Sequence, residues 1–193
     1  KSRNMSRINT RPAQTDDIPQ LLELLDIASY GFVNHIFTVL SEPGTDVDSV
    51  VVARMGDNSS HLALSKTTIA EVGDQVAGFI VLEPQPDPVD PVAEDTPAIL
   101  RPLLELESLA LGTTVVSFVA TVPAMRGRGV GKFLMEQAEK SRGSNGICLT
   151  VHDQNNGARK LYERLGFQEA ARRAIVKKGW DSPASEWVLM IKP

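Results

Sequence analysis

A glycine-rich turn lies between an apolar run and a helical pattern in residues 119–140. It holds Gly127, Gly129 and Gly131 at alternate positions, with an arginine on each side of the first. Backbone N–H groups at a helix start lack intrahelical partners and carry partial positive charge, and glycine lets the backbone approach an anion closely. The turn therefore predicts a phosphate-binding site, although a plain strand-to-helix connection with solvated arginines has the same pattern.

Two familiar phosphate loops do not fit this turn. A Walker loop needs Ser or Thr after its lysine, whereas Lys132 is followed by Phe133. A dinucleotide fingerprint beginning at Gly127 needs a third glycine where Lys132 stands. It also needs an acidic residue at the end of the next strand, and residues 147–151 contain none. Both nucleoside triphosphates and dinucleotides are disfavoured as ligands.

A second polar pattern, NNGARKLYERLGF, occupies residues 155–167. Taken alone it has a structural explanation. Asn155 or Asn156 is a helix N-cap by default, and Gly166 is a conventional helix stop. Tyr162 shares a helical stripe with apolar residues, which is also typical of a core tyrosine whose hydroxyl is satisfied.

The two patterns together resemble a known family. RGRGVG, residues 126–131, resembles R/Q-x-x-G-x-G, the pyrophosphate loop of the GNAT superfamily of acetyl-CoA-dependent N-acetyltransferases. NNGARKLYERLGF is similar to its second signature, in which Asn precedes A-x-x-x-Y and Gly-Phe closes. FVATVP resembles the family's splayed fourth strand, and INTRPAQTDDIPQLLELL its first strand and helix, so the likeness covers nearly the whole chain.

The resemblance implies acetyl-CoA as cosubstrate and no metal. It implies that the fourth strand pairs through its backbone with the pantetheine arm and that the turn amides hold the pyrophosphate. Asn155 would contact the cofactor arm. Tyr162 would protonate the departing coenzyme A thiolate, a task that suits a hydroxyl protonated at neutral pH. The implied cofactor-binding residues are Val119, Ala120, Thr121, Arg126, Gly127, Arg128, Gly129, Val130, Gly131, Lys132, Asn155 and Tyr162.

An amine acceptor must lose a proton before it attacks, because an ammonium has no lone pair. The candidate bases are Glu107, then Glu83, then Glu105, each of which is otherwise a solvated surface charge. His152 follows a strand and is a candidate proton relay, and the three histidines show no metal-ligand spacing. Cys148 lies in an apolar strand and is expected to be a buried, inert thiol.

We therefore expect acetyl transfer to a primary amine by direct attack in a ternary complex, without an acyl-cysteine intermediate. The alternative is a non-catalytic acyl-CoA-binding sensor or interaction module. The acceptor stays open among small amines, aminoglycoside-like ligands, peptide N-termini and protein lysines. Residues 26–56 and the Pro-rich segment 83–110 are expected on the acceptor side. The insertion at 84–110 is expected to be either a lid or a subunit contact of a homodimer.

Composition limits these functions further. The chain has 193 residues, a net charge of −4 and a single cysteine. A single cysteine can form no intrachain disulfide. The chain lacks the excess of basic residues that is typical of nucleic-acid-binding proteins, and it contains no apolar run of about 18 residues that could span a membrane. A cytoplasmic protein with neither nucleic acid nor membrane as partner is expected. Residues 1–4 read as a cloning remnant before a natural start at Met5, and residues 5–193 as one acetyltransferase domain.

The elements that must position these residues follow from hydrophobic periodicity. The pattern predicts an α/β (α+β) fold with a mixed sheet. The resemblance implies the GNAT-like form of this fold, a mostly antiparallel central sheet of about seven strands, flanked by helices and splayed between strands 4 and 5. The expected strands cover 7–12, 61–72, 75–84, 113–122, 146–151, 167–178 and 185–192. The expected helices cover 15–29, 29–41, 46–56, 97–109, 130–142 and 155–166.

Overall fold

The computed structural model describes residues 7–193, so the expected remnant and Met5 lie outside the described residues. The chain divides into two compact units. Among the described residues, unit 1 comprises 7–82 together with 118–137, and unit 2 comprises 83–117 together with 138–193. The extent of a single acetyltransferase domain stays a prediction.

The secondary structure agrees closely with the periodicity. The helices are α1 (Ile18–Ser29), α2 (Phe32–Leu40), α3 (Val47–Met55), α4 (Arg101–Glu107), α5 (Val130–Lys140) and α6 (Asn156–Arg164). The strands are β1 (Ile8–Pro12), β2 (Thr67–Val72), β3 (Gln75–Pro84), β4 (Thr114–Thr121), β5 (Ile147–His152), β6 (Gln168–Ala174) and β7 (Glu186–Lys192). Short 3-10 turns occupy Thr15–Asp17, Leu64–Lys66 and Pro123–Met125.

The strands form one mixed sheet in the order β1-β2-β3-β4-β5-β7-β6. The pairs β1–β2, β2–β3, β5–β7 and β6–β7 are antiparallel, and β4–β5 is parallel. The parallel register covers only residues 114–116 against 147–149. This short pairing agrees with the predicted splay between the fourth and fifth strands, and the mixed sheet of seven strands is confirmed.

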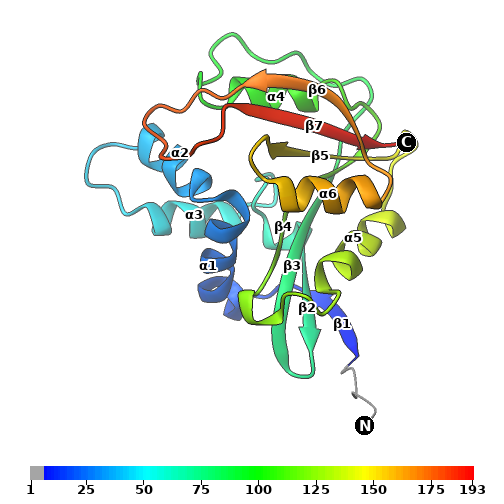
Figure 1. Ribbon diagram of the computed structural model, residues 1–193. Helices are drawn as coiled ribbons and strands as arrows, with labels where there is room; N and C mark the ends of the chain where they lie inside the picture. Colours follow the sequence, from blue (N-terminus) through cyan, green and yellow to red (C-terminus); the bar gives the residue numbers. More distant parts are fainter. Residues whose placement is uncertain (1–6) are drawn as a thin grey trace. The chain divides into compact units, whose positions relative to one another are not determined.

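Unit 1 is built around the helices of the first third of the chain. α1, α2 and α3 pack on one another, as Figure 1 shows in blue and cyan. The apolar stripe of α1 buries Leu21, Leu24 and Leu25 in a core shared with Ile69 and Phe79. Burial of this stripe, at about 25 cal/mol per Å² of apolar surface, stabilises a helix whose isolated formation would be marginal.

One strand prediction in unit 1 is too long. Residues 61–66 form turns, and the strand begins only at Thr67. Lys66 N donates to the carbonyl of Ala63 at 3.0 Å, and the Thr67 hydroxyl donates to the same carbonyl at 3.0 Å. These local bonds close a 3-10 turn, so a segment with an alternating pattern folds back before it can extend.

Unit 2 contains α4, α6 and the strands β5, β6 and β7. α4 packs against β5, β6 and β7. In Figure 1 it lies behind these strands, while α6 lies in front of β5. The Pro-rich segment before α4 is closed at its base by Gln85, whose N–H donates to Thr113 O at 2.8 Å and whose carbonyl accepts from Gly112 N. The Arg101 guanidinium donates to the carbonyls of Ala93 and Glu94.

Gly78 on β3 permits a close approach of β4 within unit 1. A Cβ at this position would lie 2.5 Å from the Ala120 carbonyl oxygen and 3.3 Å from Thr121 Cα. The added Cβ and both β4 atoms are fixed by the backbone, so no side-chain rotation can relieve this contact. Gly78 thus determines how the backbone of Ala120 and Thr121 is presented.

We expect Gly78→Ala to lower the free energy of unfolding by about 1–3 kcal/mol, because the strand must shift to admit a methyl group. Urea denaturation followed by circular dichroism measures this loss. Gly157→Ala is the matched control, since nothing lies within 4 Å of its Cβ position. A Gly78→Ala protein as stable as that control would contradict the proposed crowding.

Candidate functional site

The glycine turn opens directly into α5 within unit 1. Gly127 and Gly129 adopt φ values of 73° and 83°, and a Cβ at either would meet nothing within 4 Å. The first helical bond runs from Phe133 N to Gly129 O at 2.9 Å. Amides before Phe133 have no intrahelical acceptor at such a helix start. The left-handed glycines and the open surroundings therefore make a turn that can receive an anion.

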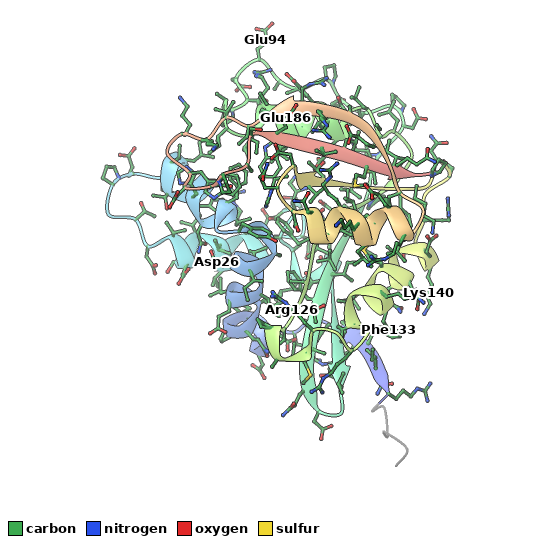
Figure 2. All side chains as sticks on the ribbon, in the orientation of Figure 1. Asp26, Glu94, Arg126, Phe133, Lys140 and Glu186 are labelled. Atoms are coloured by element: carbon green, nitrogen blue, oxygen red, sulfur yellow. The ribbon has the colours of Figure 1, made fainter. Side chains whose placement is uncertain are left out.

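The helix behind this turn is firmly anchored. Val130 and Leu134 are buried, whereas Arg126 and Arg128 are exposed. Figure 2 labels Arg126 on the turn and Phe133 on the first part of α5. Lys132 is exposed, and its Nζ lies 3.8 Å from Glu136 Oε1. Such a surface ion pair contributes little to stability. The turn thus combines a fixed backbone with two solvent-accessible guanidinium groups.

The β4 residues that the resemblance assigns to the pantetheine arm precede this turn. The side chains of Val119, Ala120 and Thr121 are half-buried. The strand is tied to β3 just beyond them, because Val122 N donates to Ala77 O at 2.8 Å. Within unit 1, β3 therefore supports the end of β4.

Unit 2 carries the residues of the second pattern. Asn155 is the N-cap of α6, and its side-chain oxygen accepts from Ala158 N at 3.2 Å. Tyr162 is 8% exposed, and its ring lies 5.8 Å from that of Phe167. Its backbone carbonyl accepts from Phe167 N at 3.0 Å. Asn155 is therefore a helix cap and Tyr162 a packed ring, the structural explanations that the sequence already offered. Both contacts hold the side chains in defined positions.

The three candidate carboxylates lie in different surroundings of unit 2. Glu83, near the end of β3, accepts a hydrogen bond from Ser117 Oγ at 3.0 Å. Glu105 on α4 is ion-paired with Arg173 of β6 at 3.2 Å. Glu107 ends α4, and its charge acts on the buried Cys148. The three carboxylates therefore differ in what they interact with: a hydroxyl for Glu83, a guanidinium for Glu105 and a buried thiol for Glu107.

Two polar residues on neighbouring strands escaped the sequence reasoning. Ser117 lies on β4 and Thr150 on β5, within runs that the pattern predicts to be apolar and buried. A hydroxyl inside such a run is the available signal, because a buried polar group needs a partner. Ser117 has one in Glu83, whereas Thr150 Oγ1 is buried without a hydrogen-bond partner in residues 7–193.

The end of β5 is braced against the β6–β7 connection. Ser185 donates to the Asp153 carboxylate through both its amide and its hydroxyl, at 3.0 and 2.7 Å. Burial raises the pKa of Asp153, but these hydrogen bonds outweigh it and lower the pKa to about 2. His152 is buried beside the stacked rings of Trp180 and Trp187, and burial lowers the pKa of its imidazole. Burial among these rings thus disfavours the charged form of His152.

Cys148 is buried, as predicted. Burial raises the pKa of its thiol to about 11; the Thr113 hydroxyl, 3.2 Å from Sγ, opposes the shift, and the Glu107 charge adds to it. The thiolate is the nucleophilic form of cysteine. A protonated, buried thiol at neutral pH is therefore unsuited to carrying an acyl group.

We expect Ellman's reagent at pH 8 to label Cys148 at least about 100-fold more slowly in the native protein than in the urea-unfolded chain. A raised pKa leaves the thiol protonated at this pH, and burial blocks the reagent in addition. The absorbance of the released thiolate measures both rates. Rapid labelling of the native protein would contradict the inert thiol.

Neither a metal centre nor a membrane span is found in the described part of the chain. Residues 7–193 contain no group of three or more His, Cys, Asp or Glu side chains that could hold a metal ion. Within the same residues, no helix is long and apolar enough to cross a membrane.

Comparison with known proteins places these features in context. Residues 63–169 match the acetyltransferase (GNAT) domain family. An uncharacterized N-acetyltransferase of Methanocaldococcus jannaschii is 36% identical over 106 residues, which are 53% of this chain and 42% of the relative. The matched part thus spans less than half of that relative's length.

Solved structures share the fold at low sequence identity. An N-acetyltransferase from Staphylococcus aureus Mu50 has a TM-score of 0.63 at 18% identity, covering 95% of this chain and 99% of its own. Arabidopsis thaliana Naa50, in complex with the bisubstrate analogue CoA-Ac-MVNAL, has a TM-score of 0.54 at 16% identity, covering 96% and 98%. At these identities the likeness concerns the fold alone.

Proposed function

The chain belongs to the GNAT acetyltransferase family, and on that premise we propose that it transfers an acetyl group from acetyl-CoA to a primary amine in a ternary complex. The observation that carries the proposal is the turn before α5, where two left-handed glycines open the backbone beside a helix start. A pyrophosphate suits such a turn, because amides and guanidinium groups both favour anionic oxygens.

The candidate residues have chemistries suited to the parts of acetyl-CoA. In unit 1, the amides from Arg126 to Lys132 would hold the pyrophosphate, and the backbone of Val119–Thr121 would pair with the pantetheine arm as an added strand does. In unit 2, Asn155 keeps amide N–H groups to offer while its oxygen caps α6. Acetyl-CoA supplies the activated acetyl group, and the chain holds and orients it.

Tyr162 is the proposed proton donor to the departing thiolate. The ring is held by burial and by Phe167, so its hydroxyl has a restricted range of positions. A phenol is protonated at neutral pH, as a general acid must be before the reaction. The acetyl group passes directly to the amine, since Cys148 is buried with its thiol pKa raised to about 11.

The acceptor is proposed only as a primary amine. The analogue bound to Arabidopsis thaliana Naa50 joins coenzyme A to a short peptide, and that observation concerns Naa50. For this chain, a panel should contain a polyamine, an aminoglycoside, a peptide with a free N-terminus and a peptide with an internal lysine. Mass spectrometry of the products identifies the class that is acetylated.

Acetyl-CoA should bind in isothermal titration calorimetry, and Gly129→Glu should abolish binding. The new side chain would fill the space above the turn and repel the pyrophosphate. Gly44→Glu is the matched control, because Gly44 has nearly the same φ, 85°, and equally open surroundings. Equal binding by both variants would show that the turn is not the pyrophosphate site.

Tyr162→Phe should lower kcat by about 100-fold while leaving the Kd for acetyl-CoA nearly unchanged. The substitution keeps the ring that packs against Phe167 and removes only the hydroxyl. Steady-state kinetics with the fastest amine of the panel give kcat, and calorimetry gives Kd. A variant with undiminished kcat would exclude Tyr162 as the acid.

A further inference from the structure

A polar group lies on one face of the sheet where the parallel pairing ends. The register pairs Val115 with Cys148 and Val116 with Leu149, the last pair of β4 with β5. Side chains alternate along strands, so Ser117 lies two positions beyond Val115 on the face of Cys148. That is the face covered by α4, whose Glu107 acts on Cys148. Ser117 is thus the first β4 side chain on this face past the last pair.

Ser117 binds the carboxylate of Glu83 through a hydrogen bond. Its hydroxyl donates to Glu83 Oε2 at 3.0 Å, from β4 to the end of β3. A hydrogen bond donated to a carboxylate favours its ionised form and limits its rotation. Glu83 is half-buried, so it is accessible without being fully solvated. A proton acceptor at an active site needs these properties together.

The other two carboxylates are less suitable as bases. Glu105 is engaged by the Arg173 guanidinium, a strong and permanently charged partner. The charge of Glu107 acts on Cys148, which lies within the stretch where β4 and β5 are still paired. The sheet backbone closes that stretch to a ligand entering between the strands. Glu83, in contrast, accepts a hydrogen bond from Ser117, which lies beyond the last pair.

Thr150 gives independent support for a ligand on this face. It lies two positions after Cys148 on β5 and so shares its face. Its Oγ1 is buried, and the described residues offer it no hydrogen-bond partner. A buried hydroxyl without a partner costs free energy, which a bound polar group or water would recover. The face therefore presents a held carboxylate and a hydroxyl that can still accept or donate.

We propose that Glu83 is the base that accepts the proton of the acceptor ammonium, and that Ser117 is the residue that positions it. The inference rests on the proposed acetyl transfer. The proton moves from the ammonium nitrogen to a Glu83 oxygen, which frees the nitrogen lone pair. That pair forms the C–N bond to the acetyl carbon as the C–S bond breaks. The sulfur takes a proton from Tyr162, and the nitrogen loses its second proton, which restores the Tyr162 hydroxyl by way of solvent. Glu83 later releases its own proton to solvent.

Glu83→Gln should lower kcat/KM for the fastest panel amine by about 100-fold at pH 7. The loss should shrink as the pH approaches the pKa of the amine, because the solution then supplies the free base. Binding of acetyl-CoA should be unchanged by calorimetry. Glu23→Gln is the matched control, since Glu23 is an exposed α1 carboxylate and its change alters the net charge equally.

Ser117→Ala should move the acidic limb of the kcat/KM profile to higher pH by about one unit, because the ionised carboxylate loses a donor. Ser117→Thr keeps a hydroxyl and should restore the wild-type limb. A merely structural serine would lower activity without moving the limb. Carbon-13 NMR of the labelled Glu83 carboxyl should show the same rise in pKa in Ser117→Ala, whatever the acceptor.

The outcomes separate this inference from the function on which it rests. If Glu83→Gln turns over within fivefold of wild type at pH 7, the base is elsewhere while acetyl transfer stands. If Ser117→Ala leaves both the limb and the NMR titration unchanged, Ser117 does not position Glu83. If the wild type binds acetyl-CoA but acetylates no amine, the transfer itself is overturned, and the role of Glu83 with it.

Discussion

The constraint on which this structure depends is the brief parallel pairing of β4 and β5. It covers three residues on each strand, 114–116 and 147–149. Strands normally continue pairing because every backbone N–H and C=O needs a partner. β5 pairs along its whole length with β7 on one edge, from Ile147 to His152, while its pairing with β4 on the other edge stops at Leu149. β4 continues instead past Ser117 towards the glycine turn, where Gly78 permits the close approach of β3. A chain that ends one pairing early leaves strand backbone for an extended ligand.

The proposed chemistry is distributed over elements of different kinds, and each element meets a different physical need. The helix start after Gly129 offers amides to an anion, and it does so without any particular side chain. Tyr162 needs a buried and packed ring, which α6 and Phe167 provide. Glu83 needs a donor and partial solvation, and it has both beside Ser117. Binding is therefore a property of the backbone, whereas proton transfer depends on a few long-range side-chain contacts.

The same reasoning explains how Cys148 differs from its neighbours. Its thiol is on the face that carries Ser117 and Thr150, yet it lies where the strands are still paired and α4 covers them. Burial there raises the thiol pKa to about 11. Two residues further along β5, a hydroxyl is buried without a partner in the described chain. The end of the pairing thus separates an inert thiol from groups that can interact with a ligand.

The sequence by itself determined the elements, the turn and the family. Those features arise from local patterns: the hydrophobic periodicity of residues 15–29, the glycine spacing before α5 and the order of the two signatures. Where a local pattern was ambiguous it misled, as in residues 61–66, whose alternation ends in a 3-10 turn. The tertiary structure alone decided which glutamate meets Ser117, since residues 83 and 117 are brought together only by strand pairing. It also decided that Glu105 faces Arg173, 68 positions away in the chain. The physical reason is that helix and turn propensity act over a few residues, whereas the environment of a carboxylate depends on contacts between residues far apart in sequence.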